Sequence, residues 1–454
     1  MNKNIEIFEN YSVPKAVFTM AIPTITSMIV SVFYNMVDTF FVGQTGDPNQ
    51  VAAVSVATPV FLFLMAAGNI FGVGGASFVS RALGEKNYDK VKNISSFCFY
   101  TGILVGLLGT FLLLTFMTPI LKAVGTSENT FKFAKDYLFW TALGGPFIVL
   151  QCAFSNLVRS EGASQKAMIG MMIGTITNIV LDPIFILDSF LGIPCLNLGV
   201  SGAAIATVIG NIVSVIIFLS HTISNNSVLT LSFNYYKIRN GILKGVLLIG
   251  LPASLTNILM SCSDIITNNL LVTYGDIHVA AMGIAKKANM LVIFVQFGIG
   301  MGIAPLIGYN YGAKKINRMK SIMKFSMLCT LVTGFILTAI YFIFTKQILS
   351  IFINSQEVIQ TGIIVLRALM ISGPLLGIMF VFNFTFQSMG KAIQSLMLAV
   401  SRQGFVFLPL ILLLKSLYGL EGVVIAQPIA DLVAIIIALG MFLSINKELK
   451  NDKI

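Results

Sequence analysis

Long apolar segments separated by short polar stretches make up almost the whole chain. Crossing the hydrocarbon core of a bilayer takes about 20 predominantly apolar residues as a helix, and each of these segments is long enough. The pattern predicts twelve helices, at residues 16–42, 51–80, 91–117, 134–157, 166–188, 196–221, 242–273, 279–311, 321–345, 361–388, 393–414 and 420–445. An all-α integral membrane protein is therefore expected.

The order of small residues and prolines occurs twice along the chain. A shift of 228 residues places Gly72-Val-Gly74 on Gly300-Met-Gly302, and Gly145-Pro146 on Gly373-Pro374. Six helices precede the junction and six follow it. Because each half has an even number of helices, the two copies share one orientation, and a pseudo-two-fold axis along the membrane normal is expected to relate them.

The repeat divides the chain into three parts. Residues 1–221 are expected to form an N-terminal lobe of helices 1–6, and residues 242–454 a C-terminal lobe of helices 7–12. The polar stretch 222–241 between them reads as a cytoplasmic linker. Most of the 29 Lys and Arg residues fall on the side of the two termini, which predicts that both termini are cytoplasmic.

Composition narrows the function classes. Of the 454 residues, 56% are hydrophobic and only 10% are charged, which leaves no room for a large soluble domain. The net charge of +11 does not indicate nucleic-acid binding, because the basic residues lie between apolar segments and not on one basic face. The five cysteines show no C-x-x-C spacing and imply neither a metal site nor a disulfide framework.

One polar element lies within the fifth apolar segment. Asn178 and Asp182 are four residues apart and share one helix face. Pro183 has no N–H and leaves a carbonyl one turn earlier without its usual partner. A carboxylate near the centre of a membrane helix costs about 2.5–3.5 kcal/mol, so it is expected to face a protein interior or a water-filled path.

Further polar residues of the first half fall at a similar depth. With a rise of 1.5 Å per residue, Asp38 and Asp182 lie within about 10 Å of the outer ends of their helices, and Asn178 and Thr207 both lie about 15 Å below theirs. Asn35 is one turn from Asp38 on the same face. Two carboxylates at one depth repel each other when both are charged, so we expect a site that takes up Na⁺ or H⁺, with Asp38, Asn178, Asp182 and Thr207 as the Na⁺ ligands.

The second half offers Asp264 and Asp431 without equally clear partners. Arg402 and Lys286, also within apolar spans, either neutralise these carboxylates or extend to the membrane interface. Pro23 lies inside the first helix and marks a place where that helix bends.

An intramembrane enzyme would need a convergent nucleophile, base or metal cluster, and no such pattern is found in the sequence. No G-x-x-x-x-G-K-[ST] loop for ATP occurs either. These observations favour a transporter driven by an ion gradient, without a cofactor. The 21 methionines and 36 phenylalanines suit a compliant apolar binding pocket.

The chain resembles the MATE (multidrug and toxic compound extrusion) transporters over its whole length, and within them the DinF-like, MepA-like branch. The resemblance is carried by the six-plus-six repeat, Pro23 ahead of Asp38, the Asn178-x-x-x-Asp182-Pro183 element and Gly202-Ala-Ala-Ile-Ala-Thr207. It implies a cation or proton site at Asp38, Asn178, Asp182 and Thr207, with Tyr137 as a looser match. The other branch uses acids of helices 7 and 10, and this sequence has none in helix 10.

The resemblance also implies two lobes around a central cavity and the export of lipophilic organic cations. We expect a monomeric multidrug exporter in contact with membrane lipids, located in the bacterial inner membrane, that exchanges Na⁺ or H⁺ for drug by alternating access. The main alternative is a lipid-linked precursor flippase of related architecture. Such a protein would favour a basic cavity for a phosphate headgroup, whereas the acids of this sequence lie in the first lobe.

Overall fold

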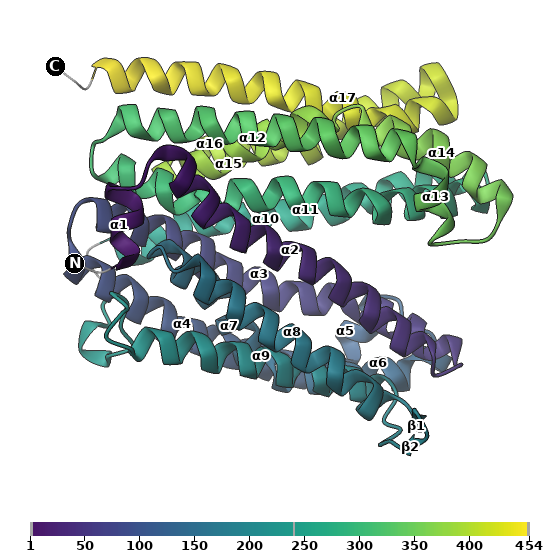
Figure 1. Ribbon diagram of the computed structural model, residues 1–454. Coiled ribbons are helices and arrows are strands. Elements are labelled where there is room, and N and C mark those ends of the chain that lie inside the picture. The colour runs from purple at the N-terminus through teal and green to yellow at the C-terminus, as the bar shows by residue number, and fades with distance from the viewer. Residues whose placement is uncertain (1–2, 239–240, 452–454) are drawn as a thin grey trace. The chain divides into compact units, whose positions relative to one another are not determined.

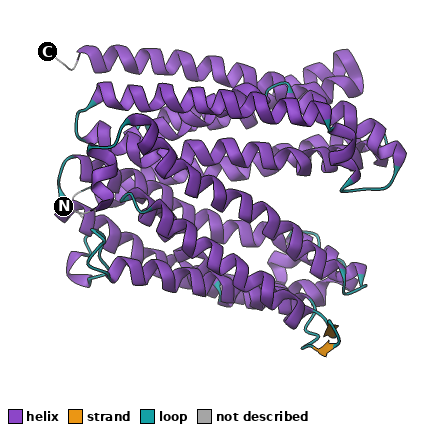
Figure 2. Ribbon diagram, viewed as in Figure 1, coloured by secondary structure: helices purple, strands orange, loops and turns teal. Residues whose placement is uncertain are grey.

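The structure is a computed structural model that describes residues 3–238 and 241–451. Helices account for nearly all of it, and strands occur only in one short hairpin (Figure 2). Over the described residues there are nine apolar helical stretches, one of which is divided at Gly419, and two bent helix pairs. Together these make the twelve predicted spans.

Two compact units are formed. The first contains the residues up to Glu9 together with Thr26–Gly250, and the second contains Asn10–Ile25 together with the chain from Leu251 onward. The sequence lobes 1–221 and 242–454 differ from these units in one respect. Each lobe's first long helix starts in the unit built mainly by the other half of the chain.

The first unit is an elongated helix bundle (Figure 1). In it α3 packs on α4, α6 and α7, while α9 packs on α6, α7 and α8. The first half of the chain has the elements α1 (Lys3–Glu9), α2 (Val13–Gly43), α3 (Pro48–Gly84), α4 (Tyr88–Thr115), α5 (Met117–Ala123), α6 (Glu128–Leu143), α7 (Gly145–Ser160), α8 (Ser164–Ile186), β1 (Ser189–Phe190), β2 (Ile193–Pro194), α9 (Val200–Ile223) and the 3₁₀ turn η1 (Phe233–Tyr235).

In the second unit α11 packs on α12, α14 and α15, in the same order as the equivalent helices of the first. The second half of the chain has α10 (Ile242–Val272), α11 (Asp276–Gly312), α12 (Ile316–Ile343), α13 (Thr345–Ser350), α14 (Gln356–Met370), α15 (Gly373–Met389), α16 (Ala392–Val400), the π-helical turn η2 (Ser401–Phe405) and α17 (Phe407–Asn451). At Gly419 the backbone of α17 leaves helical geometry, with φ 58° and ψ −129°, and separates helices 11 and 12.

Two predicted helices are each broken in the middle. The segment predicted as 134–157 consists of α6 and α7, which meet at 56°, and that predicted as 361–388 consists of α14 and α15, which meet at 47°. A Gly-Pro pair follows each break, with Pro146 in the first turn of α7 and Pro374 in the first turn of α15. Proline lacks the N–H that would continue the hydrogen-bond ladder of the preceding helix, so the helix is interrupted there.

Glycines of α3 and α11 let the ends of other helices approach closely. A side chain at Gly74 would meet the carbonyl of Val246, in the first turns of α10. A Cβ at Gly302 would lie 2.7 Å from the Cα of Ala21, in the first part of α2. Gly74 and Gly302 are a repeat-equivalent pair, so the same packing device occurs once in each unit.

The segment after α9 is fixed to the first unit. The buried carboxylate of Glu161 accepts hydrogen bonds from the hydroxyl of Ser227 (2.9 Å) and the backbone N–H of Val228 (2.8 Å), and lies 2.7 Å from His221 Nε2. On α4, Tyr100 donates its hydroxyl to the carbonyl of Leu231 at 2.9 Å. The linker therefore belongs structurally to the first unit at least as far as its 3₁₀ turn.

Candidate functional site

Asp182 and Asn178 lie on the buried face of α8. Asp182 is 0% exposed and Asn178 is 2% exposed. Neither oxygen of the Asp182 carboxylate has a hydrogen-bond partner, and the same holds for Oδ1 of Asn178. Buried polar atoms are normally satisfied. Three unsatisfied oxygens on one helix face therefore make this face a candidate site for a cation or a proton.

Thr207 connects α8 to two other helices. Its hydroxyl oxygen accepts a hydrogen bond from Asn178 Nδ2 at 3.2 Å. It also lies 3.2 Å from the hydroxyl of Tyr34 on α2, and either of these two groups can be the donor. Side chains of α2, α8 and α9 thus meet at one hydroxyl.

Asp38 lies one turn beyond Tyr34 on α2. Its Oδ1 is buried without a hydrogen-bond partner. The charge of Asp38 acts on Asp182, on Tyr34 and on Tyr137, a buried residue of α6. The predicted residues Asp38, Asn178, Asp182, Thr207 and Tyr137 are therefore brought together, and four helices contribute to the cluster.

Asn35 differs from the others. It is exposed, and its amide donates to the carbonyl of Ser31 on its own helix at 2.7 Å. The structure gives it no contact with the cluster that sequence reasoning predicted. Tyr34 was missed by that reasoning. The signal that could have found it is its place four residues before Asp38, on the same face of the helix.

Asp264 and Asp431 both have cationic partners in the second unit. Asp264 Oδ1 lies 2.6 Å from Lys286 Nζ, and both side chains are partly exposed. Asp431 Oδ1 lies 2.8 Å from Arg402 Nε, and both are largely buried. Lys286 and Arg402 thus each pair with a carboxylate, which is one of the two predicted alternatives.

The donor set of the first unit suits a hard cation or a proton. Among the described residues, no group of three or more His, Cys, Asp or Glu side chains is placed to hold a metal ion. The unsatisfied atoms are carboxylate and amide oxygens, which together with a hydroxyl fit Na⁺ and not a transition metal. The carboxylate oxygens can also accept a proton.

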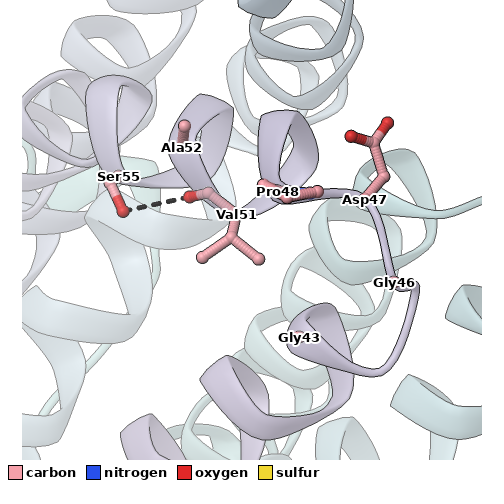
Figure 3. Close-up of a pocket in the computed structure, with 7 residues that line it drawn as sticks. All are labelled: Gly43, Gly46, Asp47, Pro48, Val51, Ala52 and Ser55. Atoms are coloured by element: carbon pink, nitrogen blue, oxygen red, sulfur yellow. Dashed lines mark hydrogen bonds between the residues drawn. The ribbon is translucent and has the colours of Figure 1, made fainter.

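A separate pocket lies where α2 gives way to α3. Its lining includes Gly43, Pro48, Val51 and Ser55. Figure 3 shows the Ser55 hydroxyl turned to the Val51 carbonyl and the carboxylate of Asp47 turned away from it. No polar groups converge there, so this pocket is not the candidate site.

The bundle of membrane spans, built twice from one pattern and enclosing unsatisfied carboxylates, defines a polytopic membrane transporter. The chain belongs to the MatE family, which matches it at residues 23–184 and again at 252–413. The matches start at Pro23 and Pro252, in agreement with the repeat. The predicted family and the predicted twelve-helix, two-lobe fold class are thereby confirmed.

Relatives match over nearly their full length. The chain is 30% identical to the multidrug export protein MepA of Staphylococcus saprophyticus, covering 100% of this chain and 98% of that one. It is 31% identical to MepA of Staphylococcus aureus, covering 96% of each. Among solved structures, an outward-facing multidrug resistance MATE family transporter of the MOP superfamily superposes with a TM-score of 0.92 at 25% identity, covering 99% of each chain.

Proposed function

We propose that this protein is a secondary active multidrug exporter of the bacterial cell membrane, which antiports Na⁺ or H⁺ against lipophilic organic cations. The proposal rests on one observation above all. The carboxylate of Asp182 is fully buried in a membrane span with both oxygens unsatisfied, and the charge of Asp38 acts on it. A pair of carboxylates in that setting is stabilised by taking up a cation or a proton.

The relatives indicate the substrate class. Both MepA proteins are described as multidrug exporters, and the superposed structure as a multidrug resistance transporter. We extend that activity to this chain, with recognition through apolar and aromatic side chains that repack around different drugs. A single alanine change at a Phe or Met of the binding surface then shifts the drug profile without abolishing all transport.

Ion binding is coupled to conformation through α2. Tyr34 and Asp38 belong to this helix, and Pro23 gives it a place to bend. When an ion or proton binds, the repulsion between the two carboxylates beside α2 is removed. If the site binds the ion more tightly in one conformation of α2 than in the other, binding shifts the equilibrium toward that conformation. The distribution of basic residues supports a cytoplasmic location for both termini.

A flippase for lipid-linked precursors is not favoured. The carboxylates of Asp38 and Asp182, which have buried oxygens without hydrogen-bond partners, repel a phosphate headgroup.

The test uses purified protein in liposomes loaded with a cationic fluorescent dye, with Na⁺ and pH gradients imposed separately. Wild-type protein should export dye under at least one gradient. Asp182→Asn and Asp38→Asn should remain monodisperse and lose gradient-driven efflux. Asp89→Asn, which removes an exposed carboxylate at the start of α4, should retain it. Efflux that is indifferent to both gradients would refute antiport, and normal gradient-driven efflux in both site variants would refute the site.

A further inference from the structure

The carboxylate of Asp431 is satisfied, in contrast to those of the first unit. Its Oδ1 accepts hydrogen bonds from Arg402 Nε at 2.8 Å and from Gln427 Nε2 at 2.9 Å. Its Oδ2 accepts one from the hydroxyl of Ser372 at 2.9 Å. The side chain is only 4% exposed, and both oxygens of this carboxylate are hydrogen-bonded within the protein, unlike those of Asp182.

Asp431 occupies the position that Asn211 has in the first unit. Gly199 and Gly419 adopt nearly the same unusual backbone conformation, with φ of 54° and 58° and ψ of −130° and −129°. Asn211 and Asp431 each follow their glycine by twelve residues, which is about 18 Å along a helix. The neutral side chains of Asn178 and Thr207 thus join α8 to α9, whereas an ion pair joins η2 to the part of α17 that follows Gly419.

Arg402 is held in place independently of Asp431. It lies in η2, where the helix widens by one residue per turn, a feature that is frequent at functional sites. Ser263 on α10 donates its hydroxyl to the carbonyl of the neighbouring Gln403 at 2.6 Å. The guanidinium also lies 5.6 Å from the centre of the Phe380 ring, within the range of a cation–π interaction.

We propose that Arg402 is a tethered cation that permanently fills a carboxylate site in the second unit, so that exchangeable ions bind only in the first. An unpaired carboxylate at this depth is costly, and the chain's own guanidinium removes that cost without an external ion. Removing the arginine side chain should turn the surroundings of Asp431 into a site for a small guanidinium compound. The statement about exchangeable ions rests on the proposed function, whereas the filled site does not.

The test measures thermal unfolding of detergent-purified protein, with and without methylguanidinium. Arg402→Ala should unfold several degrees below wild type, and millimolar methylguanidinium should restore part of the loss. Arg402→Ala combined with Asp431→Asn should be closer to wild type and insensitive to the compound. Arg367→Ala, which removes a guanidinium from α14 that has no carboxylate partner in the structure, should also be insensitive.

The outcomes separate clearly. If Arg402→Ala is as stable as wild type, or if methylguanidinium stabilises the single and double variants equally, the proposal is overturned. If Arg402→Ala does not yield monodisperse protein, recovery of the double variant supports the proposal and its failure overturns it. No gradient or drug is used, so a failure of the antiport proposal leaves this result unaffected.

Discussion

The hydroxyl of Thr207 on α9 connects three helices of the first-unit cluster. Asn178 of α8 donates to it and Tyr34 of α2 lies within hydrogen-bond distance. The Asn178 amide must point its nitrogen toward Thr207, and this leaves its oxygen, Oδ1, facing the site without a partner. The hydroxyl therefore orients a ligand in addition to joining helices.

Replacing Thr207 by valine keeps the shape and removes the hydroxyl. The Asn178 amide and the Tyr34 hydroxyl then lose a partner, at a cost of about 1 kcal/mol or more. We expect folded protein whose half-maximal coupling-ion concentration rises about tenfold, which corresponds to about 1.4 kcal/mol. Dye efflux at graded Na⁺ or H⁺ concentrations measures this, with Thr207→Ser as the control that retains the hydroxyl. Equal ion dependence in both variants would show that Thr207 does not orient the site.

At the scale of elements, close packing between α3 and α10 depends on the absence of a side chain at Gly74. Gly74→Ala would press a methyl group against the Val246 carbonyl, and overpacking of this kind typically costs about 1–3 kcal/mol. A clear fall in the unfolding temperature and in the yield of monodisperse protein is expected.

The control for this change is Gly283→Ala on α11. A Cβ there meets nothing within 4 Å, so the unfolding temperature should stay at or slightly above that of wild type. Equal stability of the two alanine variants would contradict the packing argument.

The helices and the grouping of the first-unit residues could be predicted from the sequence for different reasons, and the role of that group in ion binding stays a prediction. Apolar length alone reports a membrane span, and the spacing of Asn178 and Asp182 reports a shared face. The sequence left the pairing of Arg402 with Asp431 as one of two alternatives, because the π-helical turn that holds Arg402 leaves no mark in the apolar pattern. For Asn35, shared depth and face did not show that its amide is bonded to its own helix, and its part in the site stays a prediction.

At the scale of the whole molecule, neither half of the chain contains a complete unit. The first turns of α10 complete the first unit, and Asn10–Ile25 helps to complete the second. Sequence repeats alone do not reveal this, because a repeat reports which segments are equivalent and not which segments they contact.

This arrangement predicts how the protein behaves when cut. Fragments 1–237 and 238–454, expressed together, should associate and copurify through a tag on the first fragment. A second fragment that begins at Leu251 lacks the turns that contact α3 and should be recovered in much smaller amounts. Equal recovery of the long and short second fragments would show that these turns do not hold the first unit together.

The position of Ala21 against Gly302 also has a consequence for biosynthesis. The two residues are separated by more than 270 others in the chain. At a synthesis rate of about 5–20 residues per second, α2 enters the membrane about 14 to 55 seconds before its partner on α11 has been made. During that interval the first helix must remain in the bilayer without its final neighbours. Membrane insertion factors that shield an inserted helix until its partners are made should therefore affect the yield of this protein. The effect should be larger than for a transporter in which the helices of each repeat pack only with one another.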